Sequence, residues 1–236
     1  LCFLREQVNK QTAMKLDAPN NTCAKLVANL GFELTSAQKR VLLVISKDLS
    51  RDTPMLRLLQ GDVGSGKTVI AALAAVHAYE NGVQTALMAP TEILAEQHLA
   101  TFTEWLAPLG IETAWLSGKS KGIIRKKELQ KIKRGDAQII IGTHALFQKD
   151  VVFQKLGLVI IDEQHRFGVH QRLAMKQKGI VSSINPHQLI MTATPIPRTL
   201  TMTLYADMDV SVIDELPPGR TKVKTTVLPD TRRAEV

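Results

Sequence analysis

The sequence is poor in cysteine, in aromatic residues and in long apolar runs. Its two cysteines, Cys2 and Cys23, are too few for a disulfide framework. We therefore expect a protein that resides in a reducing compartment or whose fold does not depend on the redox state of its surroundings. The longest uncharged apolar run, residues 69–76, is far shorter than the roughly 18 residues of a membrane-spanning helix. Only 4% of the residues are aromatic, which argues against a protein that stacks unpaired bases on aromatic side chains.

The remaining composition is that of a folded, basic domain. Hydrophobic residues make up 44% of the 236 residues and charged residues 22%, which excludes disorder over most of the length. Lys and Arg outnumber Asp and Glu by 30 to 22, and this excess favours a polyanionic partner, nucleic acid first, held by its phosphates. The chain begins at Leu1 without a signal-peptide pattern and stops at Val236 within a charged stretch, so we expect it to be part of a larger protein.

Apolar runs alternate with segments of helical pattern along most of the chain. Strands that are apolar at every residue are buried on both faces, so the alternation predicts an α/β fold with a mostly parallel sheet and helices on both sides. The predicted strands are 55–59, 84–88, 111–116, 138–141, 158–161 and 188–191, and the predicted helices are 68–81, 92–106, 122–133 and 169–178. Thr35-Ser-Ala-Gln38 forms a capping box before a further helix.

Changes in composition divide the chain into three regions. Residues 1–31 are predicted to be a helical connecting segment, 32–208 the main lobe, and 209–236 a connection that begins with one more strand. Nearly every predicted strand of the lobe runs into a polar loop marked by glycine or proline. Ligands of open α/β sheets bind at the carboxyl ends of the strands, so we expect the functional residues to gather at that edge.

A phosphate-binding motif, Gly61-Asp-Val-Gly-Ser-Gly-Lys67-Thr68, follows the first predicted strand and opens a helix. Glycines let successive backbone N–H groups face a phosphate, while the lysine supplies positive charge and the threonine hydroxyl can ligate Mg²⁺. An incidental glycine-rich turn is the alternative, but a strand before the motif and a helix after it favour ATP binding. The assigned residues are Gly61, Gly64, Ser65, Gly66, Lys67 and Thr68.

Two adjacent acids, Asp162 and Glu163, end a predicted buried strand. Asp162 is predicted to hold Mg²⁺ opposite Thr68, and Glu163 to orient and deprotonate the water that attacks the γ-phosphate. The alternative is a pair of solvated acids at a helix N-terminus, and the phosphate loop upstream makes this interpretation less favoured. The pair therefore indicates ATP hydrolysis with Lys67, Asp162 and Glu163 as catalytic residues. The histidines within predicted helices, His77 and His98, are expected to be packed or solvated.

The motifs together resemble those of superfamily 2 helicases and translocases, which implies a RecA-like lobe. The matching segments are 32–38 for the glutamine motif, 61–68 and 162–165 for motifs I and II, 88–98 and 141–147 for motifs Ia and Ib, and 191–200 for motif III. Segments 59–68, 162–172 and 212–220 are closely similar to the RecG family, bacterial ATP-dependent helicases of branched DNA. The Mfd family usually carries Glu and Gln where Gln164 and His165 stand here, and the PriA family is a more distant candidate.

The resemblance implies further roles, each with an ordinary structural alternative. Gln38 and Phe32 are similar to residues that contact the adenine, although Gln38 can also act as the cap. Gln164, His165, Thr192 and Thr194 are similar to residues that couple hydrolysis to DNA movement, although the threonines can simply cap a strand end. Pro90, Thr91, Thr143 and His144 are similar to strand-tracking contacts, with ordinary loop chemistry as the alternative.

The family resemblance also implies parts that this chain does not contain. They are a second RecA-like lobe, which supplies an arginine finger worth on the order of 10³–10⁵ in turnover, and an N-terminal wedge domain. The lobe alone is expected to bind Mg·ATP weakly and to hydrolyse it barely. Lysines and arginines between Lys119 and Arg134 can lie along duplex phosphates, but a solvated helix face is slightly favoured.

We therefore predict the ATP-binding lobe of a DNA motor that remodels branched double-stranded DNA by fork regression and branch migration, in the bacterial cytoplasm at the nucleoid. The alternatives are an Mfd- or PriA-like translocase lobe and a non-catalytic nucleotide-sensing module. A phosphate-loop kinase is a third possibility, but no acceptor-binding segment or lid is visible. ATP and Mg²⁺ are the expected cofactors, and no membrane is involved.

Overall fold

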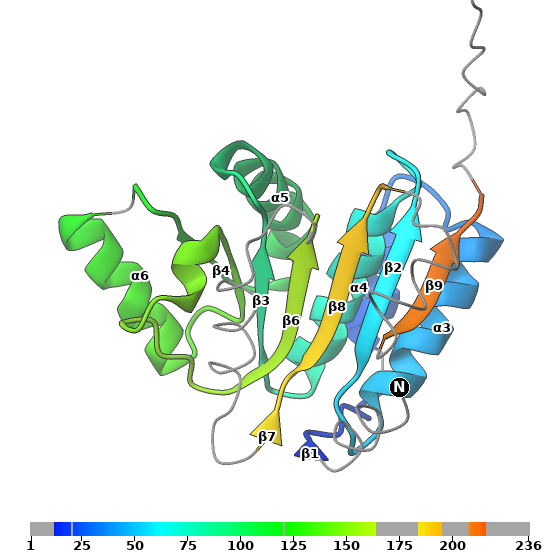
Figure 1. The fold of residues 1–236 in the computed structure, drawn as a ribbon, viewed down its shortest axis with the longest axis horizontal. Helices are drawn as coiled ribbons and strands as arrows, with labels where there is room; N and C mark the ends of the chain where they lie inside the picture. The colour runs from blue at the N-terminus through cyan, green and yellow to red at the C-terminus, as the bar shows by residue number, and fades with distance from the viewer. Residues whose placement is uncertain (1–11, 20, 120, 164–183, 195–207, 216–236) are drawn as a thin grey trace, which may run out of the picture.

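The computed structural model describes residues 12–19, 21–119, 121–163, 184–194 and 208–215. Its centre is a seven-stranded sheet in which every pair of neighbours is parallel (Figure 1). The strands lie in the order β4-β5-β3-β6-β8-β2-β9. Their bounds are β2 Leu56–Gly61, β3 Gln84–Met88, β4 Thr113–Leu116, β5 Ile139–Gly142, β6 Leu156–Asp162, β8 His187–Thr192 and β9 Asp209–Ile213.

The predicted α/β class is confirmed, and the predicted strands differ from the observed ones by at most two residues at either end. The central strands are the apolar ones, because helices and loops cover both of their faces: all five residues of β3 and the first six of β6 are buried. The expected helix at 169–178 lies outside the described residues.

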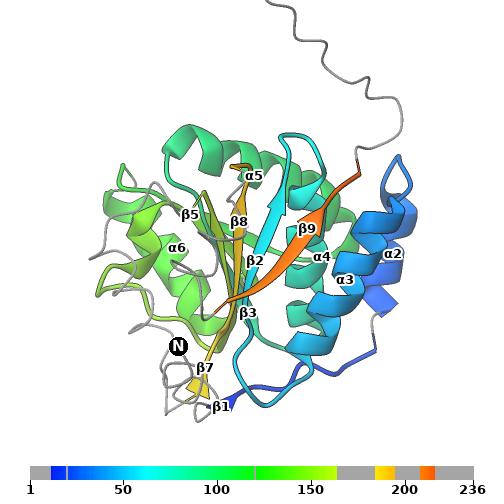
Figure 2. The same cartoon turned by 45° about the vertical axis from the view of Figure 1, so that its right-hand side comes forward.

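Among the described residues, four α-helices cover one face of the sheet and one covers the other (Figure 2). The first group comprises α2 Asn21–Asn29, α3 Ser36–Leu49, α4 Lys67–Glu80 and α5 Glu92–Leu106, which ends in the short 3-10 helix η1 Ala107–Leu109. Helix α4 lies between the sheet and α2 and α3, so all ten residues from Val69 to Ala78 are buried. On the opposite face lie α6 Gly122–Arg134 and the 3-10 helix η2 His144–Phe147.

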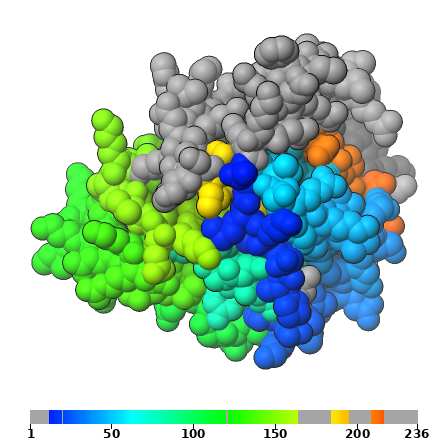
Figure 3. Space-filling model, turned by 90° about the horizontal axis from the view of Figure 1, so that it is seen from below, coloured from blue at the N-terminus to red at the C-terminus, as the bar shows by residue number. Residues whose placement is uncertain are grey.

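The N-terminal segment, predicted to be connecting material, packs onto the lobe. A two-residue strand, β1 Thr12–Ala13, pairs with β7 Ile184–Asn185, and Leu16 and Leu26 are fully buried in the core under α2. Seen from below, this segment crosses the amino-terminal end of the sheet beside β7 (Figure 3). Backbone bonds from Ala13 to Asp52 and from Leu16 to Leu49 hold it there. The lobe thus includes residues on the N-terminal side of the predicted boundary.

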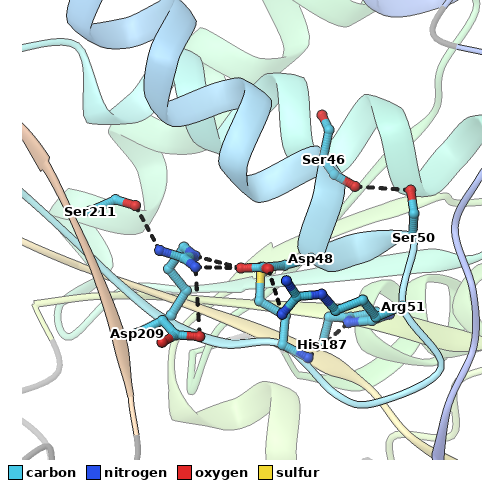
Figure 4. A network of polar contacts seen from close by, with 9 residues as sticks. Ser46, Asp48, Ser50, Arg51, His187, Asp209 and Ser211 are labelled. Atoms are coloured by element: carbon cyan, nitrogen blue, oxygen red, sulfur yellow. Dashed lines mark hydrogen bonds and ion pairs between the residues drawn. The ribbon is translucent and has the colours of Figure 1, made fainter.

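The sheet also extends past the other predicted boundary, because β9 pairs in parallel with β2 as an edge strand. A buried cluster around Arg57 of β2 joins the two strands to α3. Figure 4 labels its partners Asp48 of α3 and Asp209 and Ser211 of β9. The Arg57 guanidinium donates to Asp48 Oδ2 at 2.8 Å and to the Ser211 hydroxyl at 2.9 Å, and lies 3.6 Å from Asp209. The residues expected to lead out of the lobe therefore begin as part of its sheet.

Candidate nucleotide and metal site

The phosphate loop connects β2 to α4 in a conformation that requires glycine. Gly64 and Gly66 have φ angles of +78° and +90°, in the left-handed region that side chains other than glycine rarely adopt. A Cβ added to Gly66 would lie 2.2 Å from Nε2 of Gln38, and one added to Gly61 would lie 2.5 Å from the Ser65 hydroxyl oxygen. The loop therefore closes tightly on itself, as the motif predicts.

Two features of this loop fit a bound phosphate. Gly66 is the N-cap residue of α4 and has no side chain to bond the first amides of the helix, which leaves its positive end open to an anion. The hydroxyl of Ser65 is buried and has no hydrogen-bond partner among the described residues. A buried unpaired hydroxyl is costly, and a phosphate oxygen would satisfy it.

The Lys67 side chain lies inside the loop. Its ammonium donates to the carbonyl oxygens of Gly61, at 2.7 Å, and Asp62, at 3.0 Å. Burial lowers the pKa of Lys67, while the nearby carboxylates of Asp162, Glu163 and Asp62 oppose that shift. The lysine therefore lies near enough to the acid pair for their charges to act on it.

The acid pair lies at the same edge of the sheet as the loop. Asp162 ends β6, which pairs with β8, and β8 pairs with β2, so two strand spacings of about 10 Å in total separate the acids from the end of β2. Thr192 lies between them, beside Gln60 of β2. The strand order therefore brings the phosphate loop, Thr192 and both acids together, as expected for a shared ligand.

Glu163 is held in an unusual conformation. Its φ of +50° is the only positive value among the described residues other than glycine, and such a conformation costs on the order of 1 kcal/mol or more. The carboxylate accepts from the Thr192 hydroxyl at 3.2 Å and from the Ala193 amide at 3.0 Å, and the Thr194 amide donates to the same hydroxyl at 3.1 Å. The predicted motif III threonines thus fix the position of the predicted base.

Asp162 is held from the other side by a residue that the sequence reading assigned no role. The Nε2 atom of His98, on α5, lies 2.9 Å from Oδ2 of Asp162. The expectation that His98 is merely packed or solvated is therefore incomplete, since its ring is buried and bonded to the predicted metal ligand. Sixty-four residues separate the two in sequence, and the contact depends on the pairing of β3 with β6, with α5 following β3, which the sequence did not predict.

The donor set suits Mg²⁺, which prefers carboxylate and hydroxyl oxygens. Asp162 offers a carboxylate oxygen beyond the one that faces His98, and Thr68, the second residue of α4, offers its hydroxyl. A pocket of about 230 Å³ opens at this edge, between the phosphate loop, Ala193, the end of β9 and the two residues that follow it. A phosphate group can therefore approach the loop from this pocket.

The two residues predicted to contact adenine have other partners in the structure. Gln38 is buried; its Nε2 donates to the Ser65 carbonyl at 2.8 Å, and its Oε1 accepts from the Thr35 amide at 2.9 Å. The predicted capping box is confirmed, and Gln38 also supports the phosphate loop. The ring of Phe32 meets Trp105 edge-on, with the ring centroids 6.5 Å apart. Contact of either residue with adenine stays a prediction.

The residues predicted to track DNA follow two neighbouring strands, β3 and β5. Thr91 caps α5 by accepting from the Leu94 amide at 3.3 Å, and it is exposed beside the half-buried Pro90. Thr143 is only 3% exposed, whereas the next residue, His144, is exposed. Of this second pair, the His144 side chain is the one that a partner can reach. The coupling residues Gln164 and His165 lie outside the described residues.

The basic segment forms α6, a helix with a single buried residue, Ile132. Arg125 donates to Asp150 at 2.8 Å, and Lys119, just before the helix, pairs with Glu92 of α5. Ile123 and Ile124 are exposed at its first turn. Contact of this helix with DNA stays a prediction. No helix of the described residues is long and apolar enough to cross a membrane.

Comparison with known proteins places these features in one family. The family described as DEAD/DEAH box helicase matches residues 35–203. The chain is 60% identical over 225 residues to the ATP-dependent DNA helicase RecG of Haemophilus influenzae, covering 95% of this chain and 32% of that protein. It is 59% identical to the Escherichia coli K12 RecG over 233 residues, covering 99% of this chain and 34% of that protein. The chain spans about a third of the length of these relatives.

Solved structures agree with the sequence relatives. A structure described as RecG bound to a three-way DNA junction superposes with a TM-score of 0.87 at 41% identity, covering 99% of this chain and 31% of that one. The DUF1998 helicase MrfA bound to DNA matches with a TM-score of 0.63 at 19% identity, over 87% of this chain and 31% of that one, which supports the fold alone. The predicted resemblance to RecG and the RecA-like helicase fold are confirmed.

Proposed function

The chain belongs to the DEAD/DEAH box helicase family, and on this premise we propose that it is the ATP-binding lobe of a motor that remodels branched DNA. The observation that carries the proposal is the strand order, which brings the open phosphate loop with Lys67 and the acids Asp162 and Glu163 to one edge of the sheet. The similarity to RecG proteins, one of which was solved on a three-way junction, supports branched double-stranded DNA as the substrate.

The residues at this edge divide the work of phosphoryl transfer. The loop amides and Ser65 bind the β- and γ-phosphates, and Lys67 exchanges its bonds to Gly61 and Asp62 for the charge of the phosphates. Thr68 and Asp162 would hold Mg²⁺, which neutralises charge that develops on the phosphate oxygens. Glu163 takes the proton of the attacking water, while Thr192 and Ala193 keep its carboxylate oriented.

The same contacts can link hydrolysis to movement. The Thr192 hydroxyl donates to Glu163 and accepts from the Thr194 amide. A displacement of Glu163 on loss of the γ-phosphate would therefore be passed to the residues at the end of β8. The loops after β3 and β5, with Pro90, Thr91 and His144, are proposed to follow one DNA strand at the same edge. A second lobe and a wedge domain of the same polypeptide are proposed partners, and Gln164 and His165 are proposed to couple the lobes.

Substituting Glu163→Gln tests this function in the full-length protein that contains the lobe. The variant should bind Mg·ATP with an affinity close to that of the unmodified protein, because the amide keeps the shape and one acceptor. Its DNA-stimulated turnover should fall by at least about 10²-fold, since a general base typically contributes 10²–10⁴. Steady-state ATPase assays with and without a three-way junction, and calorimetric ATP binding, measure the two effects.

Glu104→Gln, at an exposed position of α5, is the matched control and should leave turnover unchanged. A nucleotide-sensing module that does not hydrolyse ATP would lose nothing on Glu163→Gln. Unchanged turnover in that variant, or unmodified protein that neither binds ATP nor responds to branched DNA, would overturn the proposal.

A further inference from the structure

We propose that His98 is a positioning residue for the Mg²⁺-holding carboxylate of Asp162. The inference deepens the proposed function and rests on it, because it assigns His98 a role at the same site. Its basis is the bond between His98, which is buried, and Asp162, which is partly buried; the two residues come from different elements.

The contact has a defined direction. An ionised carboxylate has no hydrogen to donate, so the Nε2–H of the imidazole is the donor and Oδ2 of Asp162 the acceptor, at 2.9 Å. The side chains of His98 and Asp162 are 10% and 13% exposed, so water competes little for the bond. One lone pair of Oδ2 is thereby used by the histidine, and the other carboxylate oxygen, Oδ1, stays available to a metal ion.

The ring of His98 is itself held by the packing of α5. His98 lies on the buried face of the helix together with Ala95 and Phe102, and Phe102 is fully buried in the core. The rings of His98 and Phe102 meet edge-on at 86°, with their centroids 6.5 Å apart. The helix contacts β4 and β5 of the sheet and is capped by Thr91, so the imidazole projects toward Asp162 from a fixed support.

The two acids are therefore held from opposite sides. Glu163 is bonded to Thr192 and Ala193 at the end of β8, and Asp162 is bonded to His98 of α5. Groups that form a hydrogen bond with a metal ligand fix the orientation of that ligand, and their loss commonly costs about 10–100-fold in metal affinity or activity. Without His98, the Asp162 carboxylate could rotate or turn both oxygens to water, and its affinity for the ion would fall.

The test compares nucleotide binding with and without metal. The dissociation constant of a fluorescent ADP analogue is measured in excess Mg²⁺ and in EDTA, and the ratio of the two values gives the contribution of the metal. His98→Ala should reduce this ratio by about 10-fold, while binding in EDTA stays within about twofold of the unmodified protein. His77→Ala is the matched control, since His77 is a buried helical histidine whose Nε2 bonds the Leu16 carbonyl at 2.7 Å.

Two further variants keep the test decisive if His98→Ala does not fold. The amide nitrogen of glutamine reaches the position of Nε2, whereas that of asparagine is too short to do so. His98→Gln should therefore retain a ratio within about threefold of the unmodified protein, and His98→Asn should lose as much as His98→Ala. Equal ratios in the Gln and Asn variants, or an unchanged ratio in a folded His98→Ala, would overturn the inference and leave the proposed function standing. Unmodified protein that binds no nucleotide with Mg²⁺ would instead count against the proposed function.

Discussion

Two clusters of charged residues lie at opposite ends of β2, and they are built in different ways. At the amino end, the buried Arg57 guanidinium bonds directly to the buried Asp48 carboxylate (Figure 4). At the carboxyl end, the Lys67 ammonium bonds to backbone carbonyls, while the nearby acids bond to His98, Thr192 and Ala193. Opposite charges are paired in the first cluster and held apart in the second.

The difference separates a structural cluster from a functional one. Paired buried charges satisfy each other, so the Arg57 cluster joins α3, β2 and β9 and has little capacity for a ligand. In the Lys67 cluster, burial lowers the pKa of the lysine and the nearby carboxylates oppose that shift, but the ammonium bonds to backbone carbonyls. A site whose cation and acids are held separately is suited to receive a phosphate and a metal ion.

The largest expected effect comes from removing Lys67. Lys67→Ala should lower DNA-stimulated ATP turnover by about 10²–10³-fold, because it removes a cation that is aimed at the transferred phosphate. Its thermal stability should change little, since the Lys67 ammonium is half-buried and the nearby carboxylates oppose the effect of that burial. Steady-state kinetics and thermal denaturation of the same preparation measure both effects.

Lys47→Ala, at an exposed position of α3, is the control for charge removal and should change neither quantity. A Lys67→Ala protein that is strongly destabilised would contradict the comparison, because it would give the lysine a structural role like that of Arg57.

The opposite cluster should respond in the opposite way. Arg57→Met should lower the free energy of unfolding by about 3–5 kcal/mol, because it leaves Asp48 buried without its closest partner. The double variant Arg57→Met, Asp48→Leu should recover most of that loss, because an apolar pair of similar volume is often neutral. Urea denaturation measures the free energies, and ADP binding by the folded variants should be unaltered.

Arg40→Met provides the matched control for this pair. Arg40 bonds Asp214 at 2.7 Å, but both side chains are more than half exposed, and such pairs contribute at most about 1 kcal/mol. If Arg57→Met cost no more than Arg40→Met, burial of the charge would not be the property that distinguishes the Arg57 cluster.

The site at the carboxyl edge was predictable because its functional residues lie in two short sequence segments with recognisable motifs. The loop that contains Lys67 needs glycines at fixed spacing, and Asp162 and Glu163 directly follow an apolar strand. The class of fold followed from the same alternation of strands and helices. The rule that ligands bind at the carboxyl ends of parallel strands then brought these two segments together without coordinates.

The contacts that support the site were not predictable in this way, because they join residues far apart in sequence. His98 and Asp162 are 64 residues apart, and Arg57 and Ser211 are 154 apart. Considered singly in the sequence, each of these residues could equally be an ordinary surface or core residue. The burial of Leu16 was not predicted, and the strand β9 was predicted but not its pairing with β2, since both depend on contacts with residues far away in sequence.

The smallest expected effect concerns His187, which lies near the Arg57 cluster at the start of β8 (Figure 4). The ring is fully buried; its Nδ1 accepts from the Met55 amide at 3.0 Å and its Nε2 donates to the Met14 carbonyl at 2.8 Å. Burial lowers the pKa of His187 below its usual value near 6.5, with the Met14 carbonyl and Asp48 opposing the shift. A proton on Nδ1 would also face the Met55 amide hydrogen and break that bond.

The sign of the resulting pH dependence follows from the lowered pKa. Below about pH 6.5 the unfolded chain takes up a proton at this histidine that the folded chain refuses, so the stabilisation is present above pH 6.5 and lost as the pH falls toward the folded-state pKa. The slope from this one group is at most about 1.4 kcal/mol per pH unit. His187→Asn, whose side-chain oxygen can replace Nδ1 as the acceptor, should flatten the dependence of unfolding free energy on pH between 6.5 and 5. His144→Asn, at an exposed position, should leave that dependence unchanged, and equal slopes in the two variants would show that His187 is not held neutral by the fold.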